Sequence, residues 1–394
     1  MIIDLKNDPK AFRAAIRDWI AETLPADWAD VAERGTEDEA IEYQRWWFRE
    51  LAKQGLAVPH WPQAYGGADL DLAGQMIVAD EMARGGTPSL SVYVVTLNHL
   101  PGTLIPCGND AQRARYLPEA ARGAVWCQGF SEPGAGSDLA SLRCRAVRDG
   151  DHYVINGQKI WSSMSRYAQH CILLVRTDPD VAKHAGISFL IMDMDSPGLE
   201  IRKIEQMDGQ ADFSELFLTD VRIPVANLVG AENDGWRVAQ ATLASERGVL
   251  AFEAAERRRH LMADFYRKAV ASNAAWLDDD TLRREFMSLL ADLQAGRRLI
   301  RNLLRDHGHG ESQAATALAS ARIKLFQTTL IQKIGDMVTR IEGLEGHAWQ
   351  PFHAQRRFVG LFDYLHSFAW TISGGTNEIM RNLIAERDLR LPKG

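Results

Sequence analysis

Apolar residues recur at helical spacing through the first part of the chain. They lie three and four positions apart over 11–24 and 37–54, which predicts two amphipathic helices. Further helices are expected over 71–84 and 90–104, after a break at a stretch rich in proline and glycine. Residues 1–122 therefore predict an N-terminal α-helical domain.

The pattern changes near Ala124, from helical spacing to short apolar runs separated by turn residues. Runs at 144–147 and 152–155 flank Asp149-Gly150, and Asn156-Gly157 follows, which predicts consecutive strands joined by tight turns. Four later runs have the same character: 172–175, 187–192, 199–204 and 216–221. We expect residues 123–230 to form a middle domain, an antiparallel β-sheet or β-barrel.

Long amphipathic stretches return after Asp234, at 236–270, 281–306, 312–341 and 378–387. Several long helices of this kind pack most readily as a bundle, so residues 231–394 predict a C-terminal four-helix bundle. The expected fold class is α+β and multidomain, with helical regions on either side of an all-β insert.

Composition and charge exclude several classes of protein. The chain has 394 residues and a formal net charge of −7, which argues against nucleic acid as a main partner. No apolar run of about 18 residues occurs, so no membrane span is expected. The N-terminus lacks the layout of a signal peptide. Four cysteines without metal-type spacing predict reduced thiols, no metal site and a cytoplasmic protein: Cys107, Cys127, Cys144 and Cys171.

A glycine-rich segment at 128–138 is the clearest candidate for chemistry. It reads Gln-Gly-Phe-Ser-Glu-Pro-Gly-Ala-Gly-Ser-Asp between apolar, strand-like residues. Glycines let a backbone approach a ligand closely, and successive N–H groups form an anion-binding concavity. A second segment at 157–163, Gly-Gln-Lys-Ile-Trp-Ser-Ser, offers an aromatic ring beside two hydroxyls. Together they predict a cofactor that carries a flat ring and a phosphate.

These two segments resemble the signature of the acyl-CoA dehydrogenase family of flavoproteins, and the resemblance extends over the whole chain. It implies the family's three-domain architecture and FAD as the cofactor. Ser162 and Ser163 would hydrogen-bond along the edge of the flavin. Gln128 stands where many relatives have an aromatic residue, which would alter the flavin's environment.

The resemblance also gives roles to other residues of the two segments. Phe130 and Ser131 would contact the isoalloxazine edge, where backbone N–H or hydroxyl donors stabilise negative charge on the reduced ring. Ser137 would lie near the pyrophosphate or the acyl-CoA. Trp161 would lie against the flavin face, although a tryptophan in a strand is more commonly part of a protein core.

Dehydrogenation of an acyl-CoA needs a base for the α-proton while a hydride leaves the β-carbon. A carboxylate serves as base when burial raises its pKa. Glu246 and Arg247 flank an apolar stripe on the helix expected after Asp234, so a carboxylate there would be substantially buried. From the residues alone, the alternative is an ordinary interfacial salt bridge.

The resemblance favours Glu246. Most family members carry the catalytic glutamate in a C-terminal loop, and that position is Gly374 here, followed by Gly375. Members similar to the isovaleryl-CoA and long-chain enzymes place the base on the earlier helix, in a Glu-Arg pair like Glu246-Arg247. We therefore predict Glu246 as the base. The expected substrate contacts are Ser137, Arg247, Gly374 and Gly375.

Thr376 and Glu378 open the last predicted helix. Free N–H groups at a helix N-terminus suit a phosphate, and acidic residues are common there because of the helix dipole. The resemblance places both residues at the cofactor, so Glu378 is not our candidate for the base.

Two family motifs that reach a neighbouring subunit's FAD are missing. No Arg-x-x-Phe-Gly occurs in 265–280, and Glu342-Gly343-Leu344-Glu345-Gly346 stands where a Gly-Gly-x-Gly stretch is usual. Two acidic residues near a pyrophosphate are electrostatically unfavourable. The chain resembles subunits of heteromeric acyl-CoA dehydrogenases, including those acting on sterol side chains. A heterotetramer with a second such subunit and a homo-oligomer with altered FAD contacts both remain open.

The leading function is thus an FAD-dependent acyl-CoA dehydrogenase that forms a trans-2-enoyl-CoA and passes electrons to an electron-transfer flavoprotein. A flavin monooxygenase or oxidase on the same fold is the alternative, because fold does not fix function. A structural subunit without chemistry is the third. The retained set of Ser131, Ser137, Trp161 and Glu246 favours the dehydrogenase.

Overall fold

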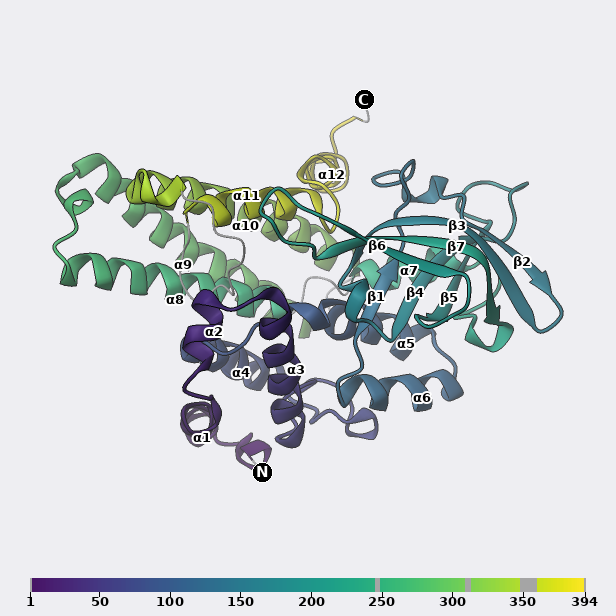
Figure 1. Ribbon diagram of the computed structural model, residues 1–394, viewed down its shortest axis with the longest axis horizontal. Helices are drawn as coiled ribbons and strands as arrows, with labels where there is room; N and C mark the ends of the chain where they lie inside the picture. Colours follow the sequence, from purple (N-terminus) through teal and green to yellow (C-terminus); the bar gives the residue numbers. More distant parts are fainter. Residues whose placement is uncertain (1, 245–248, 309–312, 348–359, 393–394) are drawn as a thin grey trace. The chain divides into compact units, whose positions relative to one another are not determined.

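The computed structural model describes residues 2–244, 249–308, 313–347 and 360–392 (Figure 1). The chain divides into two compact units, each of which is assembled from separate stretches of sequence. The sheet unit comprises Gln44–Asp69 and Leu90–Glu246. The helical unit comprises Met1–Tyr43, Leu70–Ser89 and Arg247–Gly394.

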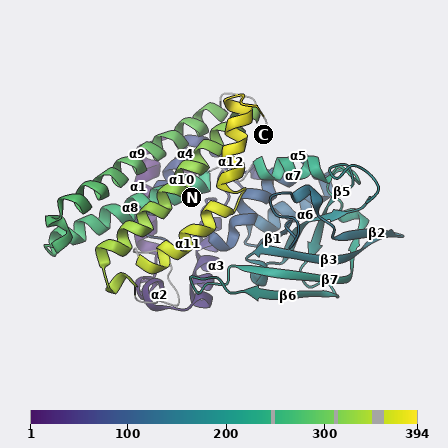
Figure 2. The same ribbon diagram turned by 90° about the horizontal axis from the view of Figure 1, so that it is seen from above.

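The sheet unit is built on a seven-stranded sheet. Its strands are β1 (Trp126–Gly129), β2 (Arg145–Asp149), β3 (His152–Ser163), β4 (His170–Arg176), β5 (Ile187–Asp193), β6 (Leu199–Ile204) and β7 (Phe213–Pro224). The strand order is β1-β4-β2-β3-β7-β6, with β5 paired to β4. Figure 2 shows β3, β7 and β6 lying side by side.

The sheet is mixed. Four pairings are antiparallel, as expected: β2–β3, β3–β7, β4–β5 and β6–β7. The pairings β1–β4 and β2–β4 are parallel. Parallel neighbours need a long crossover connection, and the β2–β3 hairpin with its flanking loops supplies one between β1 and β4.

The turn predicted at Asn156-Gly157 is wrong, because β3 continues through it to Ser163. The register of β3 against β7 shifts there, as in a β-bulge. Gly157 has φ +154°, and a Cβ on it would stand 2.8 Å from the Cα of Cys144. This glycine therefore permits the segment around Cys144 to approach β3 closely, and it does not reverse the direction of the strand.

Burial along the strands shows how the unit is held together. Every residue of β4 is buried, and β5 is buried from Ile187 to Met192, so this part of the sheet is covered on both faces. β7 alternates between buried and partly exposed positions over much of its length. The helices of the unit are α5 (Leu100–Cys107), α6 (Asp110–Ala121), α7 (Gly235–Ala244) and the part of α3 (Glu37–Lys53) beyond Tyr43.

The helical unit holds the remaining helices. They are α1 (Pro9–Thr23), α2 (Trp28–Arg34), α4 (Leu72–Gly85), α8 (Val249–Ala271), α9 (Asp280–Gly308), α10 (Gln313–Glu342), α11 (Gly360–Ile372) and α12 (Asn377–Leu383). Contacts link α8 to α9, α9 to α10 and α10 to α11, as in the predicted bundle (Figure 2). The predicted order of helical, sheet and helical regions is confirmed. Helix α11 was not predicted.

A network of ion pairs crosses α1, α4 and α8 in the helical unit. The buried Glu81 carboxylate receives hydrogen bonds from Arg13, Arg17 and Arg84. Burial alone would raise the pKa of Glu81, but these three guanidinium groups outweigh it and lower the pKa. The buried carboxylate of Glu81 is tolerated because it is paired with these partly exposed arginines.

Candidate functional site

The glycine-rich segment forms a tight turn directly after β1. Glu132 and Ala135 exchange both backbone hydrogen bonds, at 3.1 and 3.0 Å, with Pro133 and Gly134 at the tip. Among the described residues, none except the chain neighbours comes within 4 Å of the place where a Cβ would stand on Gly134 or Gly136. The outer side of the turn is therefore open, as a loop that receives a ligand should be.

Strand β3 holds this turn from the side. The backbone N–H of Ile160 donates to the Ser131 carbonyl at 3.0 Å. The fully buried Lys159 donates from Nζ to Glu132 Oε1 at 2.7 Å and to the Phe130 carbonyl at 3.2 Å. The two motifs singled out in the sequence are thus joined in space.

Trp161 is displayed outward from β3. A second register shift against β7 lies between Lys159 and Ser162, and Trp161 has φ +62°. This left-handed conformation is uncommon for a bulky residue and marks a functional or strained position. The indole ring is 52% exposed and meets Phe213 edge-on, with centroids 6.1 Å apart. An aromatic plane is therefore offered to a partner, which is unlike a core tryptophan.

Two predicted cofactor residues carry buried polar atoms with no hydrogen-bond partner. Within the described part of the chain, neither Gln128 Oε1 nor Ser162 Oγ is satisfied. Buried polar groups are almost always paired, so these two atoms are available to bond a ligand or a water. Beside an exposed indole and an open glycine turn, they fit a flat, polar-edged ring such as the isoalloxazine of FAD.

The other residues predicted in these segments differ in what they can offer. Phe130 is 5% exposed, and its ring packs edge-on against Phe189 at 5.7 Å, so only its backbone is available. Ser131 and Ser163 are partly buried, and Ser137 is exposed. All of these residues belong to the sheet unit.

The predicted glycines and the last helix lie in the helical unit. Gly374 and Gly375 have φ +63° and +84°. Thr376 caps α12 by accepting a hydrogen bond from the Ile379 N–H at 3.2 Å. The pKa of Glu378 is lowered by its own backbone N–H and by Thr376, as expected at a helix N-terminus. Its carboxyl group is exposed and ionised, which does not suit a base with a raised pKa.

Lys324 of α10 orders this glycine turn, a contribution that the sequence did not reveal. Its Nζ donates to the carbonyls of Thr371 and Gly375, at 3.3 and 2.7 Å, and to Asn377 Oδ1 at 3.0 Å. A lysine on a helix surface gives no sequence signal for such a role.

Comparison with known proteins settles the family. Sequence models of the N-terminal, middle and C-terminal domains of acyl-CoA dehydrogenases match residues 6–124, 127–221 and 233–389. The chain belongs to the acyl-CoA dehydrogenase family. It is 37% identical over 401 residues to acyl-CoA dehydrogenase IpdE1 of Mycobacterium tuberculosis, which covers 98% of this chain and 99% of that protein. It is thus a member of a family of flavoprotein oxidoreductases that act on CH–CH bonds in lipid metabolism.

Solved structures of acyl-CoA dehydrogenases have the same fold. The Tcur3481–Tcur3483 steroid acyl-CoA dehydrogenase matches with a TM-score of 0.84 and 29% identity, over 98% of both chains. The ChsE4–ChsE5 complex from Mycobacterium tuberculosis matches with a TM-score of 0.80 and 29% identity, also over 98% of both chains. None of the described helices is both long and apolar enough to span a bilayer.

The regions of this acyl-CoA dehydrogenase that lack the two cross-subunit motifs have structures of their own. After α8, the chain turns at Asn273, and Trp276 packs against Phe265 and Phe286 in the core of the helical unit. At the end of α10, Glu342 Oε2 accepts a hydrogen bond from the Gly360 N–H at 2.9 Å. An aromatic corner and an acidic turn stand at the two places where the resemblance to the family led us to look for FAD contacts.

The predicted base, Glu246, and its neighbour Arg247 lie outside the described residues. Helix α7 leads toward them and ends at Ala244. It is anchored to α5 by the buried hydroxyls of Thr242 and Thr103, whose Oγ atoms are 2.7 Å apart.

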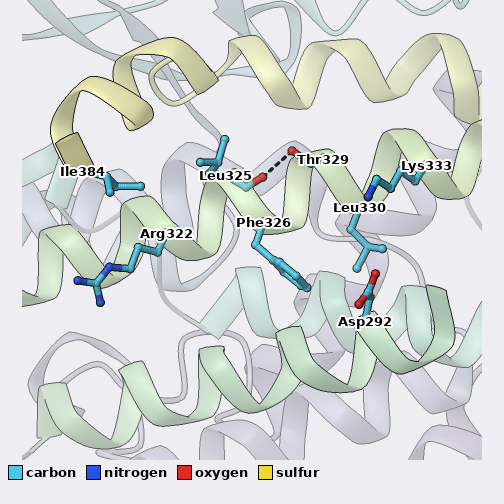
Figure 3. A pocket seen from close by; sticks show the side chains of 8 residues that line it. All are labelled: Asp292, Arg322, Leu325, Phe326, Thr329, Leu330, Lys333 and Ile384. Carbon is cyan, nitrogen blue, oxygen red and sulfur yellow. Dashed lines mark hydrogen bonds between the residues drawn. The ribbon is translucent and has the colours of Figure 1, made fainter. Parts of the chain in front are cut away.

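A hollow of about 330 Å³ lies on the helical unit (Figure 3). It lies against α9 and α10 and is mainly apolar. The residues that line it are Asp292, Arg322, Leu325, Phe326, Thr329, Leu330, Lys333 and Ile384. It contains none of the predicted site residues, and we assign it no role in the chemistry.

Proposed function

We propose that this chain is an FAD-dependent acyl-CoA dehydrogenase that converts an acyl-CoA thioester to a trans-2-enoyl-CoA. The observation that carries this proposal is a pair of buried atoms without a partner among the described residues: Gln128 Oε1, just before the glycine turn, and Ser162 Oγ, next to the exposed Trp161 in the sequence. When bound, FAD supplies the acceptor for the hydride that leaves the β-carbon. The chain's own residues hold that acceptor and remove the α-proton.

Glu246 is the proposed base. Its carboxylate takes the α-proton as the C–H electron pair forms the new double bond and the β-hydride departs, so two electrons and two hydrogens leave the substrate. Arg247 and the turn with Gly374 and Gly375 would position the thioester. The left-handed φ of Gly374 supports the assignment of the base to Glu246 rather than to the C-terminal loop, because a glutamate at position 374 would be strained.

The remaining residues would bind and orient the cofactor. Trp161 would lie against the flavin face, and Ser131, Ser162 and Ser163 would hydrogen-bond to its edge. Phe130 would contribute through its backbone. Ser137 would contact the pyrophosphate or acyl-CoA, and Thr376 and Glu378 would meet the cofactor at the N-terminus of α12.

We infer that the working enzyme is heteromeric and acts on a steroid-derived acyl-CoA in the cytoplasm. The absence of both cross-subunit FAD motifs from the sequence supports a partner chain that supplies them. The names of two structural relatives support both points, since one is a two-chain steroid acyl-CoA dehydrogenase and the other a complex of two chains. Electrons would pass to an electron-transfer flavoprotein.

Flavin content tests the proposal. The chain is expressed alone and with a candidate second subunit, and FAD per chain is measured from the visible spectrum together with the mass in solution. We expect little FAD in the isolated chain and full loading in the heteromer. One FAD per chain in a homo-oligomer would contradict the proposed heteromeric assembly but would remain consistent with the proposed dehydrogenase activity. Rapid oxidation of the reduced flavin by oxygen would favour an oxidase or monooxygenase instead.

Ser162→Ala should weaken FAD binding without weakening the fold. The substitution removes a buried hydroxyl that has no partner among the residues the structure describes, so the unfolding midpoint of the flavin-free form should stay constant or rise. One lost neutral hydrogen bond should raise the FAD dissociation constant about two- to tenfold. Flavin fluorescence titration and thermal unfolding measure the two quantities.

Ser188→Ala is the matched control for this prediction. Ser188 is equally buried, but its hydroxyl is paired with Thr177 and with the Asn233 N–H. This variant should lose stability and keep its FAD affinity. An Ser162→Ala variant that behaved in the same way would show that Ser162 has only a structural role.

A further inference from the structure

Lys159 and Glu132 form a buried ion pair at the base of the glycine turn. Lys159 is fully buried, and the side chain of Glu132 is 10% exposed. Glu132 also accepts hydrogen bonds from the backbone N–H groups of Arg143 and Cys144, at 2.7 and 2.8 Å. Its two oxygens therefore receive three donors, which fixes the carboxylate and leaves it committed to the protein rather than to proton transfer from a substrate.

Two consecutive residues of β3 determine the direction of the backbone at Phe130 and Ser131. Lys159 Nζ donates to the Phe130 carbonyl, so this carbonyl points toward the lysine. The Ile160 N–H donates to the Ser131 carbonyl, so this carbonyl points toward β3. The peptide bond between Phe130 and Ser131 is trans, so its N–H points away from its carbonyl. The Ser131 N–H consequently points away from Lys159, and it makes no hydrogen bond within the part of the chain that is described.

We propose that the Lys159–Glu132 pair is a positioning element of the cofactor site, which holds the Ser131 N–H ready to donate to the edge of the flavin. This inference rests on the proposed function, because it requires FAD to bind at this turn. Glu132 holds the ammonium group, the ammonium group orients the peptide, and the peptide presents a donor. A fixed donor aimed at the place where negative charge develops favours reduction without reorganisation.

The buried Lys159–Glu132 pair is stable because its charges and hydrogen-bonding groups are satisfied. Burying a single charge is costly, and a buried pair is stable only when its remaining hydrogen-bonding capacity is satisfied. Here the lysine bonds a carboxylate and a carbonyl, and the carboxylate bonds two backbone N–H groups. The result is a rigid turn of the kind that a binding site needs around its contacting groups.

The test compares Lys159→Met with the double variant Lys159→Met/Glu132→Gln in the FAD-loaded full chain, with its partner subunit if loading requires one. Methionine keeps the length of the side chain and loses the ammonium group. We expect a rise of about tenfold or more in the FAD dissociation constant, as is typical when a group that orients a ligand-binding residue is lost. We also expect a more negative reduction potential of the bound flavin, since its reduced form loses a donor.

The double variant separates positioning from stability. Glu132→Gln removes the carboxylate left unpaired by the first substitution, so the unfolding midpoint should recover relative to Lys159→Met. FAD affinity and the reduction potential should stay impaired, because the Phe130 carbonyl still lacks its donor. Recovery of both quantities in the double variant would overturn the proposal, since only charge balance would then matter.

Lys183→Met is the control. Lys183 pairs at 2.7 Å with Asp138, the last residue of the glycine-rich segment, but the lysine side chain is 48% exposed. The Lys183→Met substitution should therefore change FAD affinity by less than about threefold. Wild-type affinity and potential in Lys159→Met, with only a lower unfolding midpoint, would contradict a positioning role and leave the proposed function intact. Failure of the wild-type protein to bind FAD in any assembly would overturn both.

Discussion

Glu246→Gln should lower the rate of acyl-CoA dehydrogenation by about 10²- to 10⁴-fold, the usual contribution of a positioned general base. Glutamine keeps the size of the side chain but cannot accept the α-proton. FAD should remain bound, because the residues proposed to hold it lie elsewhere in the sequence. The rate is measured as loss of flavin absorbance after anaerobic mixing with substrate.

The control for this variant is Glu200→Gln on β6, where the carboxylate makes an exposed ion pair with Arg202. It should leave the rate within about twofold of wild type, as surface substitutions usually do. If Glu246→Gln retained the wild-type rate and normal flavin content, the base would have to be another residue. The assignment from the Glu-Arg pair would then be wrong.

Arg176→Met should lower the free energy of unfolding of the sheet unit by about 3 kcal/mol or more, since each buried carbonyl left without a donor costs about 1–3 kcal/mol. Arg176 is 9% exposed, and its guanidinium donates to the carbonyls of Ala140, Leu142 and Lys183. Burial lowers its pKa, and nearby carboxylates only partly offset that effect. The group acts as a clamp for the loop that follows Ser137.

Hydrogen exchange in urea, read from the amides of β4 and β5, measures the stability of this unit without assuming that the whole chain unfolds together. Arg222→Met provides the control, because Arg222 is about half exposed and pairs with the exposed Asp149. That variant should change stability by no more than about 0.5 kcal/mol. An equal loss in both variants would mean that the carbonyl contacts of Arg176 contribute little.

The periodicity of apolar residues predicted the elements well. The runs at 172–175, 187–192 and 199–204 correspond to β4, β5 and β6, and the stretches at 281–306 and 312–341 to α9 and α10. Local patterns succeed here because each strand or helix buries one face or both. The parallel partner of β1 was not accessible in this way, since pairing across a crossover is a property of the tertiary structure.

The candidate site, too, could be predicted from the sequence only in part. Trp161 and the glycine turn could be found from the sequence, because both lie in segments that resemble the signature of the family. Glu132 and Lys159 lie in the same two segments, but no sequence pattern assigned them a role. Charged residues such as Lys159 normally face water. Lys159 faces inward because it lies on the same side of β3 as the buried Tyr153 and Ile155, an even number of residues away. The sequence signal that could have revealed this ion pair was a lysine at an inward-facing position of β3 together with a glutamate shortly after β1.

The central claim is that this acyl-CoA dehydrogenase holds FAD on its sheet unit and uses it to oxidise an acyl-CoA. The most direct test is anaerobic titration of the flavin-loaded enzyme, with its second subunit if one is needed, with a steroid-side-chain acyl-CoA. We predict loss of the visible flavin absorbance with formation of one enoyl-CoA per flavin. A fully loaded enzyme whose flavin stays oxidised with steroid-derived, branched and straight-chain acyl-CoAs alike would contradict the account.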